Sequence, residues 1–295
     1  MHTSGMVRIG FIGLGDMGSQ MARHLVDAGH DVRGFDVDDD TLADAVEVGV
    51  TPANSSADAV AGAEVVFLSL PDPQTVELVV EELGDSVEAG TVVIDTTTST
   101  PSTTNDIADD LAEQRVDVLG APISGGKHGA AAGTLSVMAG GDEAVYEACT
   151  PLFEAFATDC FYVGPEPGHG HAVKLLNNIL SYTTLLATSE AVIVGRAAGL
   201  DPGLLVDVFS ASTGRSSASD DKIPNQVLTG DYDTGFPLSL TEKDVVLFTE
   251  FAEELGTPAL MGAVTRMLVG FARSSEGDDG DMTRVYDFLE RVMLR

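Results

Sequence analysis

Positive charge is scarce in this sequence. It has 15 Lys and Arg residues against 47 Asp and Glu residues, which gives a formal net charge of −32. Because such a surface repels nucleic acid and anionic membranes, we expect neither as a partner. The acidic residues are spread along the whole chain, and dissolved salt would screen their mutual repulsion, which favours a high-salt cytoplasm. The lysines are so few that each is a stronger candidate for a specific role: Lys127, Lys174, Lys222 and Lys243.

Cysteines and long apolar runs are also few. Cys149 and Cys160 do not suggest a disulfide framework or a metal site, and we expect both to be reduced. No apolar run reaches the roughly 20 residues that span a bilayer. The N-terminal MHTSGMVRIGF runs directly into a strand pattern, so we expect no signal peptide. Together these absences favour a soluble, cytoplasmic protein.

Strand and helix patterns alternate in the first part of the chain. Val65–Leu70 and Thr91–Asp95 are continuous apolar runs, which are typical of buried parallel strands. Repeated strand–helix units predict an α/β fold, with a parallel sheet covered by helices on both faces. Further strands are predicted at Val7–Ile12, Asp31–Asp36, Val116–Leu119, Leu135–Ala139 and Cys160–Val163, and helices at Met17–Ala28, Thr41–Val48 and 102–114.

The pattern changes after the turn-rich segment 164–168, beyond which only helical patterns follow. His171–Ala198 predicts one helix of roughly 40 Å. Ser212–Asp221 is predicted to be a loop, as is Gly230–Gly235. The domain boundary is expected near residue 167, with an all-helical domain over 168–295. The further helices are predicted at about Pro202–Ser210, Leu240–Leu255, Pro258–Arg273 and Thr283–Leu294.

A glycine pattern follows the first predicted strand. In GFIGLGDMG, Gly13 permits a tight turn, Gly15 allows the backbone to approach a pyrophosphate, and Gly18 lets the helix pack on the strand. The helix N-terminus would then face the phosphates with unpaired N–H groups. Residues 1–167 are therefore predicted to be a Rossmann domain that binds NAD. The expected cofactor-binding residues of this loop are Gly13, Leu14, Gly15, Asp16, Met17 and Gly18.

Asp36 ends the second predicted strand, where an acidic residue accepts hydrogen bonds from the adenosine ribose. A 2′-phosphate would meet this carboxylate and the three aspartates at 38–40, and no Arg follows directly to neutralise it. Arg33 lies just upstream. NAD is therefore favoured over NADP.

Four further segments carry chemistry. They are IDTTTSTPS at 94–102, GAPISGG at 120–126, GHGHAVKLLNN at 168–178 and EKD at 242–244. Together with the glycine loop they resemble the β-hydroxyacid dehydrogenase family, in the same order from about Gly10 to Asp244. The segment STGRS at 212–216 is most similar to the 3-hydroxyisobutyrate branch of that family.

The resemblance implies that Lys174 is the catalytic proton-transfer residue and that Asn178 binds the substrate. These two residues are four apart on the long helix and so share one face. A Lys in a partly closed site can have a depressed pKa, and when charged it can hold a developing alkoxide.

The resemblance also assigns the remaining site residues. Ser124, Gly125 and Gly126 look like the loop that holds the substrate carboxylate through N–H and O–H donors. The residues expected near the cofactor are Leu70, Pro71, Thr98 and Lys243. The segments at Leu70 and Pro71 have an equally plausible structural role, because any buried strand ends in a similar way.

Some alternatives stay open at this stage. His169 and His171 lack partners for a metal site, and none is expected. Arg215 is either a second anion contact or an ordinary loop residue. The favoured activity is NAD-dependent oxidation of the 3-hydroxyl of a small β-hydroxy acid to a semialdehyde. The alternatives are an L-serine dehydrogenase, an NADPH-dependent reductase of small semialdehydes or glyoxylate, and a nucleotide-sensing protein without activity. The apolar helices indicate a homo-oligomer, either a dimer or a tetramer.

Overall fold

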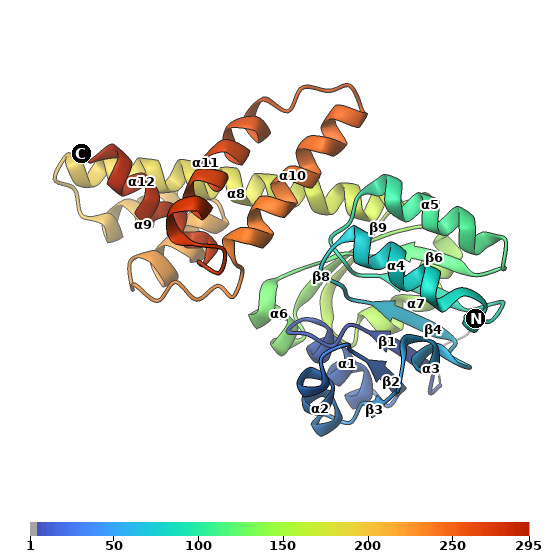
Figure 1. Cartoon of the computed structure of the whole chain (residues 1–295). Coiled ribbons are helices and arrows are strands. Elements are labelled where there is room, and N and C mark those ends of the chain that lie inside the picture. The colour runs from blue at the N-terminus through green and yellow to red at the C-terminus, as the bar shows by residue number, and fades with distance from the viewer. Residues whose placement is uncertain (1–4, 295) are drawn as a thin grey trace. The chain divides into compact units, whose positions relative to one another are not determined.

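The computed structural model describes residues 5–294, and the chain forms two compact units that divide between Lys174 and Leu175. The first unit contains a sheet with helices, and the described part of the second contains helices without a named strand (Figure 1). This confirms the predicted α/β fold, with a Rossmann-type sheet followed by a helical region. None of the described helices is both long enough and apolar enough to cross a membrane.

The sheet of the first unit is mostly parallel. Its strands lie in the order β3-β2-β1-β4-β5-β6-β8-β7, and β9 pairs with β8. Strands β1 to β6 are parallel, whereas β8 is antiparallel to β6 and β7. The strand order reverses where β1 lies beside β4, which is where such sheets bind ligands. The strands are β1 (Arg8–Ile12), β2 (Asp31–Phe35), β3 (Thr51–Pro52), β4 (Val65–Leu68), β5 (Val92–Asp95), β6 (Asp117–Gly120), β7 (Ile123–Ser124), β8 (Leu135–Gly140) and β9 (Ala157–Gly164).

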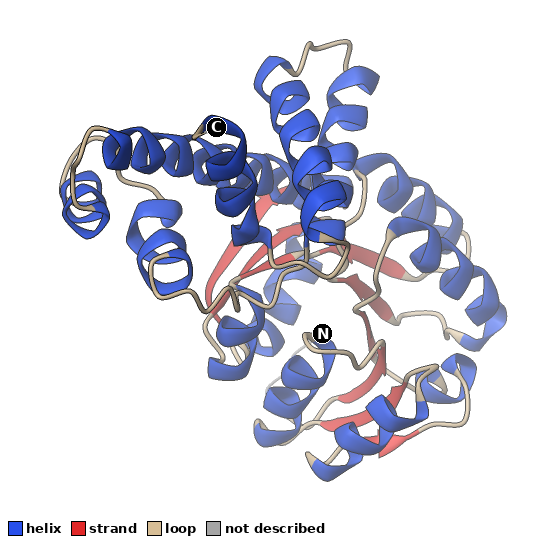
Figure 2. Cartoon of the chain, turned by 60° about the vertical axis from the view of Figure 1, so that its left-hand side comes forward, coloured by secondary structure: helices blue, strands red, loops and turns tan. Residues whose placement is uncertain are grey.

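Both faces of this sheet are covered (Figure 2), as expected for strands that are apolar throughout. On one face Phe11 and Phe67 stack with ring centroids 5.5 Å apart, and two further buried phenylalanines meet Phe67 edge-on. On the other face Ile12 and Leu68 pack with buried residues of α4 and α5. The helices of this unit are α1 (Gly18–Asp27), α2 (Asp39–Glu47), α3 (Ser56–Val60), α4 (Pro73–Leu83), η1 (Gly84–Ser86), α5 (Pro101–Ala112), α6 (Gly126–Ala132) and α7 (Glu143–Phe153).

The second unit is built on the long helix α8 (Gly168–Ala197), which starts in the first unit and continues beyond Leu175. Its core includes Val192 and Ile193 of α8, which are fully buried. The other helices are α9 (Pro202–Ser210), η2 (Ala218–Val227), α10 (Leu238–Glu254), α11 (Leu260–Glu276), η3 (Met282–Arg284) and α12 (Val285–Met293).

The structure corrects the sequence-based prediction at one loop. Part of the segment predicted as a loop, from Ala218 to Asp221, begins the π-helix η2. Ile223 and Val227 of this helix are buried in the core of the second unit, so packing decides the conformation rather than the polar local sequence. Four α-helices of the described residues were not predicted, α3, α4, α6 and α7, nor was the short helix η1.

Candidate active site

The glycine loop between β1 and α1 has the geometry that a dinucleotide requires. Gly13 has a φ of +90°, and a Cβ there would lie 2.1 Å from the carbonyl oxygen of Ser69. A Cβ on Gly18 would lie 2.0 Å from the carbonyl oxygen of Gly13. In contrast, no heavy atom beyond Gly15 and its two chain neighbours lies within 4 Å of a Cβ built on Gly15, so the backbone is open to a ligand there. These residues fit the pyrophosphate of NAD(P).

Asp36 shapes this loop. Its Oδ2 accepts a hydrogen bond of 2.7 Å from the Leu14 N–H, and its Oδ1 accepts one of 3.0 Å from the Asp38 N–H. Each carboxylate oxygen has a second lone pair, so both can still accept from ribose hydroxyls. The sequence predicted a ribose contact for Asp36, which stays a prediction, but it did not predict the hydrogen bond from Leu14 that holds the loop.

The carboxyl ends of β4 and β5 are hydrogen-bonded to each other. The Leu70 N–H donates to Thr97 Oγ1 at 3.0 Å, and the Thr97 N–H donates to Asp95 Oδ1 at 2.9 Å. Thr98 is half-buried in the same loop, and Pro71 is exposed. The segments at Leu70–Pro71 and at Thr98 therefore lie together at one edge of the sheet, whereas Lys243, also predicted near the cofactor, lies in the second unit.

The loop predicted to hold a carboxylate joins β7 to α6. Gly125 and Gly126 have φ of +134° and +63° and are exposed, and Ser124 is half-buried. Lys127 follows directly, and its Nζ forms an ion pair of 2.6 Å with Asp16 of the glycine loop. The structure thus brings the two predicted ligand-binding loops together within the first unit.

A buried pair that the sequence did not reveal fixes the start of α8. His171 Nε2 lies 3.5 Å from Asp95 Oδ2, and the Ser99 N–H donates to His171 Nδ1 at 3.3 Å. Burial raises the pKa of Asp95 to about 7 and lowers the pKa of His171 to about 3. Lys174, one turn further along α8, is also buried. The pair therefore ties the helix that carries Lys174 to the loop after β5.

In the second unit, Asn178 is part of a buried hydrogen-bond network. Its Nδ2 donates to Asp244 Oδ2 at 2.7 Å, and the Tyr182 hydroxyl donates to the same oxygen at 2.8 Å. Burial and the Asp244 carboxylate raise the pKa of Tyr182, so its hydroxyl stays protonated and keeps donating. Lys243 Nζ lies 3.5 Å from Asp244 Oδ1. Asp244 therefore orients Asn178, and the EKD motif was the signal that pointed to it.

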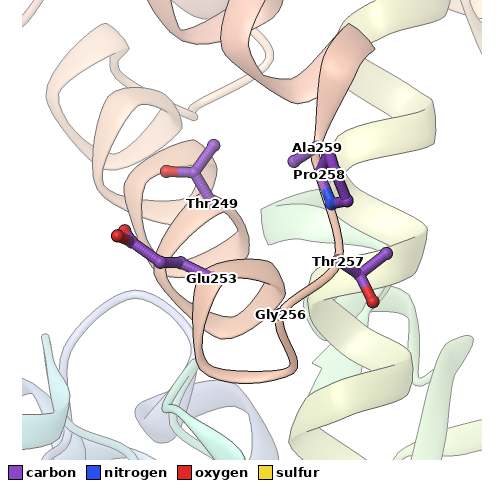
Figure 3. A pocket seen from close by; sticks show the side chains of 6 residues that line it. All are labelled: Thr249, Glu253, Gly256, Thr257, Pro258 and Ala259. Carbon is purple, nitrogen blue, oxygen red and sulfur yellow. The ribbon is translucent and has the colours of Figure 1, made fainter.

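Two other features lie outside this arrangement. Arg215 is largely exposed and forms an ion pair of 2.7 Å with Asp220. A shallow hollow lies at the turn from α10 to α11 (Figure 3), and it contains none of the predicted site residues. It is lined by Thr249, Glu253, Gly256, Thr257, Pro258 and Ala259.

Comparison with known proteins defines the family. Residues 8–164 match the model of the NAD binding domain of 6-phosphogluconate dehydrogenase. Residues 168–289 match the model described as NAD-binding of NADP-dependent 3-hydroxyisobutyrate dehydrogenase. The chain belongs to the β-hydroxyacid dehydrogenase family, as its motifs predicted, and is an NAD(P)-dependent dehydrogenase acting on CH–OH groups.

Three relatives illustrate the range of that family. The 2-(hydroxymethyl)glutarate dehydrogenase of Eubacterium barkeri is 34% identical, over 97% of this chain and 96% of that protein. The NAD-dependent L-serine dehydrogenase of Pseudomonas aeruginosa is 36% identical, over 89% and 91%. The solved structure of Mycobacterium tuberculosis 3-hydroxyisobutyrate dehydrogenase with L-serine has a TM-score of 0.91 at 30% identity, over 97% and 99%.

The buried Asp95 predicts a specific dependence of stability on pH. Because its pKa is raised in the folded state, Asp95 keeps a proton between about pH 4 and about pH 7 that the unfolded chain has released. Its contribution to the free energy of unfolding therefore falls as the pH rises through this window, by up to about 4 kcal/mol. Asp95→Asn should remove that fall.

The measurement is urea unfolding of both proteins across this range in concentrated KCl. Asp110→Asn, on the exposed face of α5, controls for the loss of one negative charge. Parallel curves for the wild type and Asp95→Asn would contradict the prediction.

Proposed function

We propose that this protein oxidises the 3-hydroxyl of a small β-hydroxy acid, of the 3-hydroxyisobutyrate type, to its semialdehyde with NAD. The observation that carries the proposal is the position of Lys174. It is buried one turn after His171, and His171 is fixed to the loop that follows β5. The same unit carries the glycine loop and the Ser124–Gly126 loop.

The residues divide the work as follows. Ser124, Gly125 and Gly126 donate hydrogen bonds to the substrate carboxylate, and Asn178 adds a further hydrogen bond. Lys174 contacts the 3-hydroxyl and takes its proton while the C3 hydride leaves. NAD supplies the hydride acceptor when it is bound. Holding the hydroxyl, the carboxylate and the neutral Lys174 amine that accepts the proton in fixed positions contributes much of the rate gain.

Replacing Lys174 tests this assignment. Lys174→Ala should lower kcat by about a thousandfold, because both proton transfer and stabilisation of the alkoxide are lost. Binding of NADH should change by less than about threefold, since uniform binding and transition-state stabilisation are separable. Arg8→Ala, which removes an exposed positive charge, is the control. Wild-type turnover by Lys174→Ala would refute the proposal.

We propose NAD rather than NADP as the cofactor. Asp36 would repel a 2′-phosphate, and the nearby Arg33 already pairs with Asp58 at 2.7 Å. Initial rates should therefore give a kcat/KM at least about tenfold higher with NAD than with NADP. Asp36→Ala should raise the KM for NAD, because the ribose contact and the hydrogen bond to Leu14 are both lost. An equal preference for the two cofactors would favour the NADPH-dependent reductase reading.

Two competing functions can be separated by the same assays. L-serine carries a 3-hydroxyl and a carboxylate and is favoured by the relative named for it and by the structure solved with it. A screen of 3-hydroxyisobutyrate, L-serine, glycerate and 3-hydroxypropionate in concentrated KCl ranks the substrates. Binding of NAD with no oxidation of any acid would favour a nucleotide-sensing protein.

We also propose that the chain forms a homo-oligomer in a high-salt cytoplasm. One face of α11 exposes four large apolar residues spaced three or four apart, as a helix that packs against a partner requires. Met267→Glu in this face should lower the mass measured by light scattering in concentrated KCl. A wild-type mass of one chain would contradict the proposal. The four residues are Leu260, Val264, Met267 and Phe271.

A further inference from the structure

Asp16 places a carboxylate at the start of α1, the helix that follows the glycine loop. The helical hydrogen bonds begin at Gly15, whose carbonyl oxygen accepts from the Ser19 N–H at 3.0 Å, so Asp16 lies in the first turn. The N–H groups of a first turn have no partner within the helix, and they are the groups that a bound pyrophosphate uses. A carboxylate at this position is attracted to the same N–H groups and can compete with an anionic ligand for them.

Other helices of the first unit show what an aspartate at a helix start does. Asp38 and Asp72 each accept from a backbone N–H in the first turn of α2 and of α4, and Asp142 accepts from two in α7. At α1 the N-cap residue is Met17, which has no side-chain oxygen and provides no cap. Asp16, the residue before it, has the oxygens that could cap the helix, but they point elsewhere.

The Asp16 carboxylate pairs with Lys127 instead. Lys127 is the second residue of α6, and its Nζ lies 2.6 Å from Asp16 Oδ2. The two side chains are 45% and 67% exposed, and an ion pair so accessible to water contributes little to the stability of the fold. A role in ligand binding therefore explains the pair better than a role in folding does.

The packing of α6 on α1 holds Lys127 in place for this contact. Arg23 of α1 donates from Nη2 to the Ala131 carbonyl oxygen at 2.8 Å, and His24 Nε2 lies 3.0 Å from the Ala130 carbonyl oxygen. The last residues of α6 are thus fixed to the middle of α1, while Lys127 at its start reaches the glycine loop. All these residues belong to the first unit.

We propose that Lys127 is a positioning residue of the cofactor site, which holds the Asp16 carboxylate off the N-terminus of α1 and leaves its N–H groups to the pyrophosphate of the dinucleotide. The inference rests on the proposed function only in that a dinucleotide binds at the glycine loop. Without Lys127, the carboxylate turns onto the N–H groups, and the pyrophosphate has to displace it. Lys127 therefore raises the affinity for the dinucleotide through Asp16 and not through a contact of its own.

Calorimetry with ADP-ribose in concentrated KCl tests the inference, because ADP-ribose has the pyrophosphate but lacks the nicotinamide ring. The salt screens any long-range attraction between the Lys127 ammonium and the phosphates, and it leaves the short-range competition for the N–H groups. Lys127→Met should raise the Kd at least about fivefold, since a carboxylate must be displaced. Its melting temperature should stay within about 3 °C of the wild-type value, because an exposed ion pair is lost.

A second background separates this role from a direct contact between Lys127 and a phosphate. Asp16→Ala removes the carboxylate and should bind ADP-ribose at least as tightly as the wild type. Adding Lys127→Met to Asp16→Ala should change the Kd by less than about twofold, because no carboxylate remains to compete. Arg8→Met removes a similar exposed ion pair at the start of β1 and should leave the Kd at the wild-type value. Circular dichroism checks that each variant is folded.

The outcomes separate this inference from the proposed function, because binding of ADP-ribose requires no turnover. If Lys127→Met weakens binding by the same factor with and without Asp16, Lys127 contacts the phosphates itself and the inference is overturned. A wild-type Kd for Lys127→Met also overturns it, and oxidation of a hydroxy acid by the wild type would still support the proposed function. If no hydroxy acid is oxidised but Asp16→Ala rescues the binding of Lys127→Met, the proposed function fails and the role of Lys127 stands.

Discussion

The arrangement of the candidate site depends on one buried contact, between Asp95 at the end of β5 and His171 in the first turn of α8. The other oxygen of Asp95 accepts from the Thr97 N–H, and the other ring nitrogen of His171 accepts from the Ser99 N–H. The pair therefore fixes the loop after β5 and the helix that carries Lys174 at the same time. Burial disfavours the charged form of both groups, so the contact contributes less to stability than its geometry alone suggests. Its main consequence is to position α8 against the loop after β5.

Because the surface is strongly acidic, positive side chains in the candidate site matter for attracting an anionic substrate. A chain with a net charge of −32 repels an anionic substrate at long range, and dissolved salt reduces that repulsion. At short range the substrate still needs a local cation. Most cations elsewhere are already engaged, as in the pairs Lys127–Asp16 and Arg33–Asp58. Lys222 differs in its hydrogen bonds, because its Nζ donates to two serine hydroxyl groups, but the carboxylate of the adjacent Asp221 also acts on its charge.

The sequence could predict those features of the fold and of the candidate site that local backbone geometry determines. The glycine spacing after β1 follows from steric limits within one turn, and the four-residue spacing of Lys174 and Asn178 follows from the helix repeat. The contacts Asp95–His171 and Asn178–Asp244 join residues far apart in the sequence, and only the folded chain brings them together. The π-helix η2 was missed for a related reason, since its serines and aspartates favour a loop locally and burial of its apolar residues decides otherwise.

The network around Asp244 shows how a buried carboxylate can lie beside Asn178, the proposed substrate ligand. Asp244 accepts from both Asn178 and Tyr182 through one oxygen, and Lys243 lies 3.5 Å from the other. The ammonium offsets the negative charge, so an approaching carboxylate meets a nearly neutral group. One N–H of the Asn178 amide donates to Asp244, and this hydrogen bond fixes the orientation of the whole amide group. The second N–H of the amide therefore points in one fixed direction. A donor that is already oriented loses little entropy when the substrate binds, and this preorganisation favours Asn178 as a ligand over the adjacent Asn177 on the same helix.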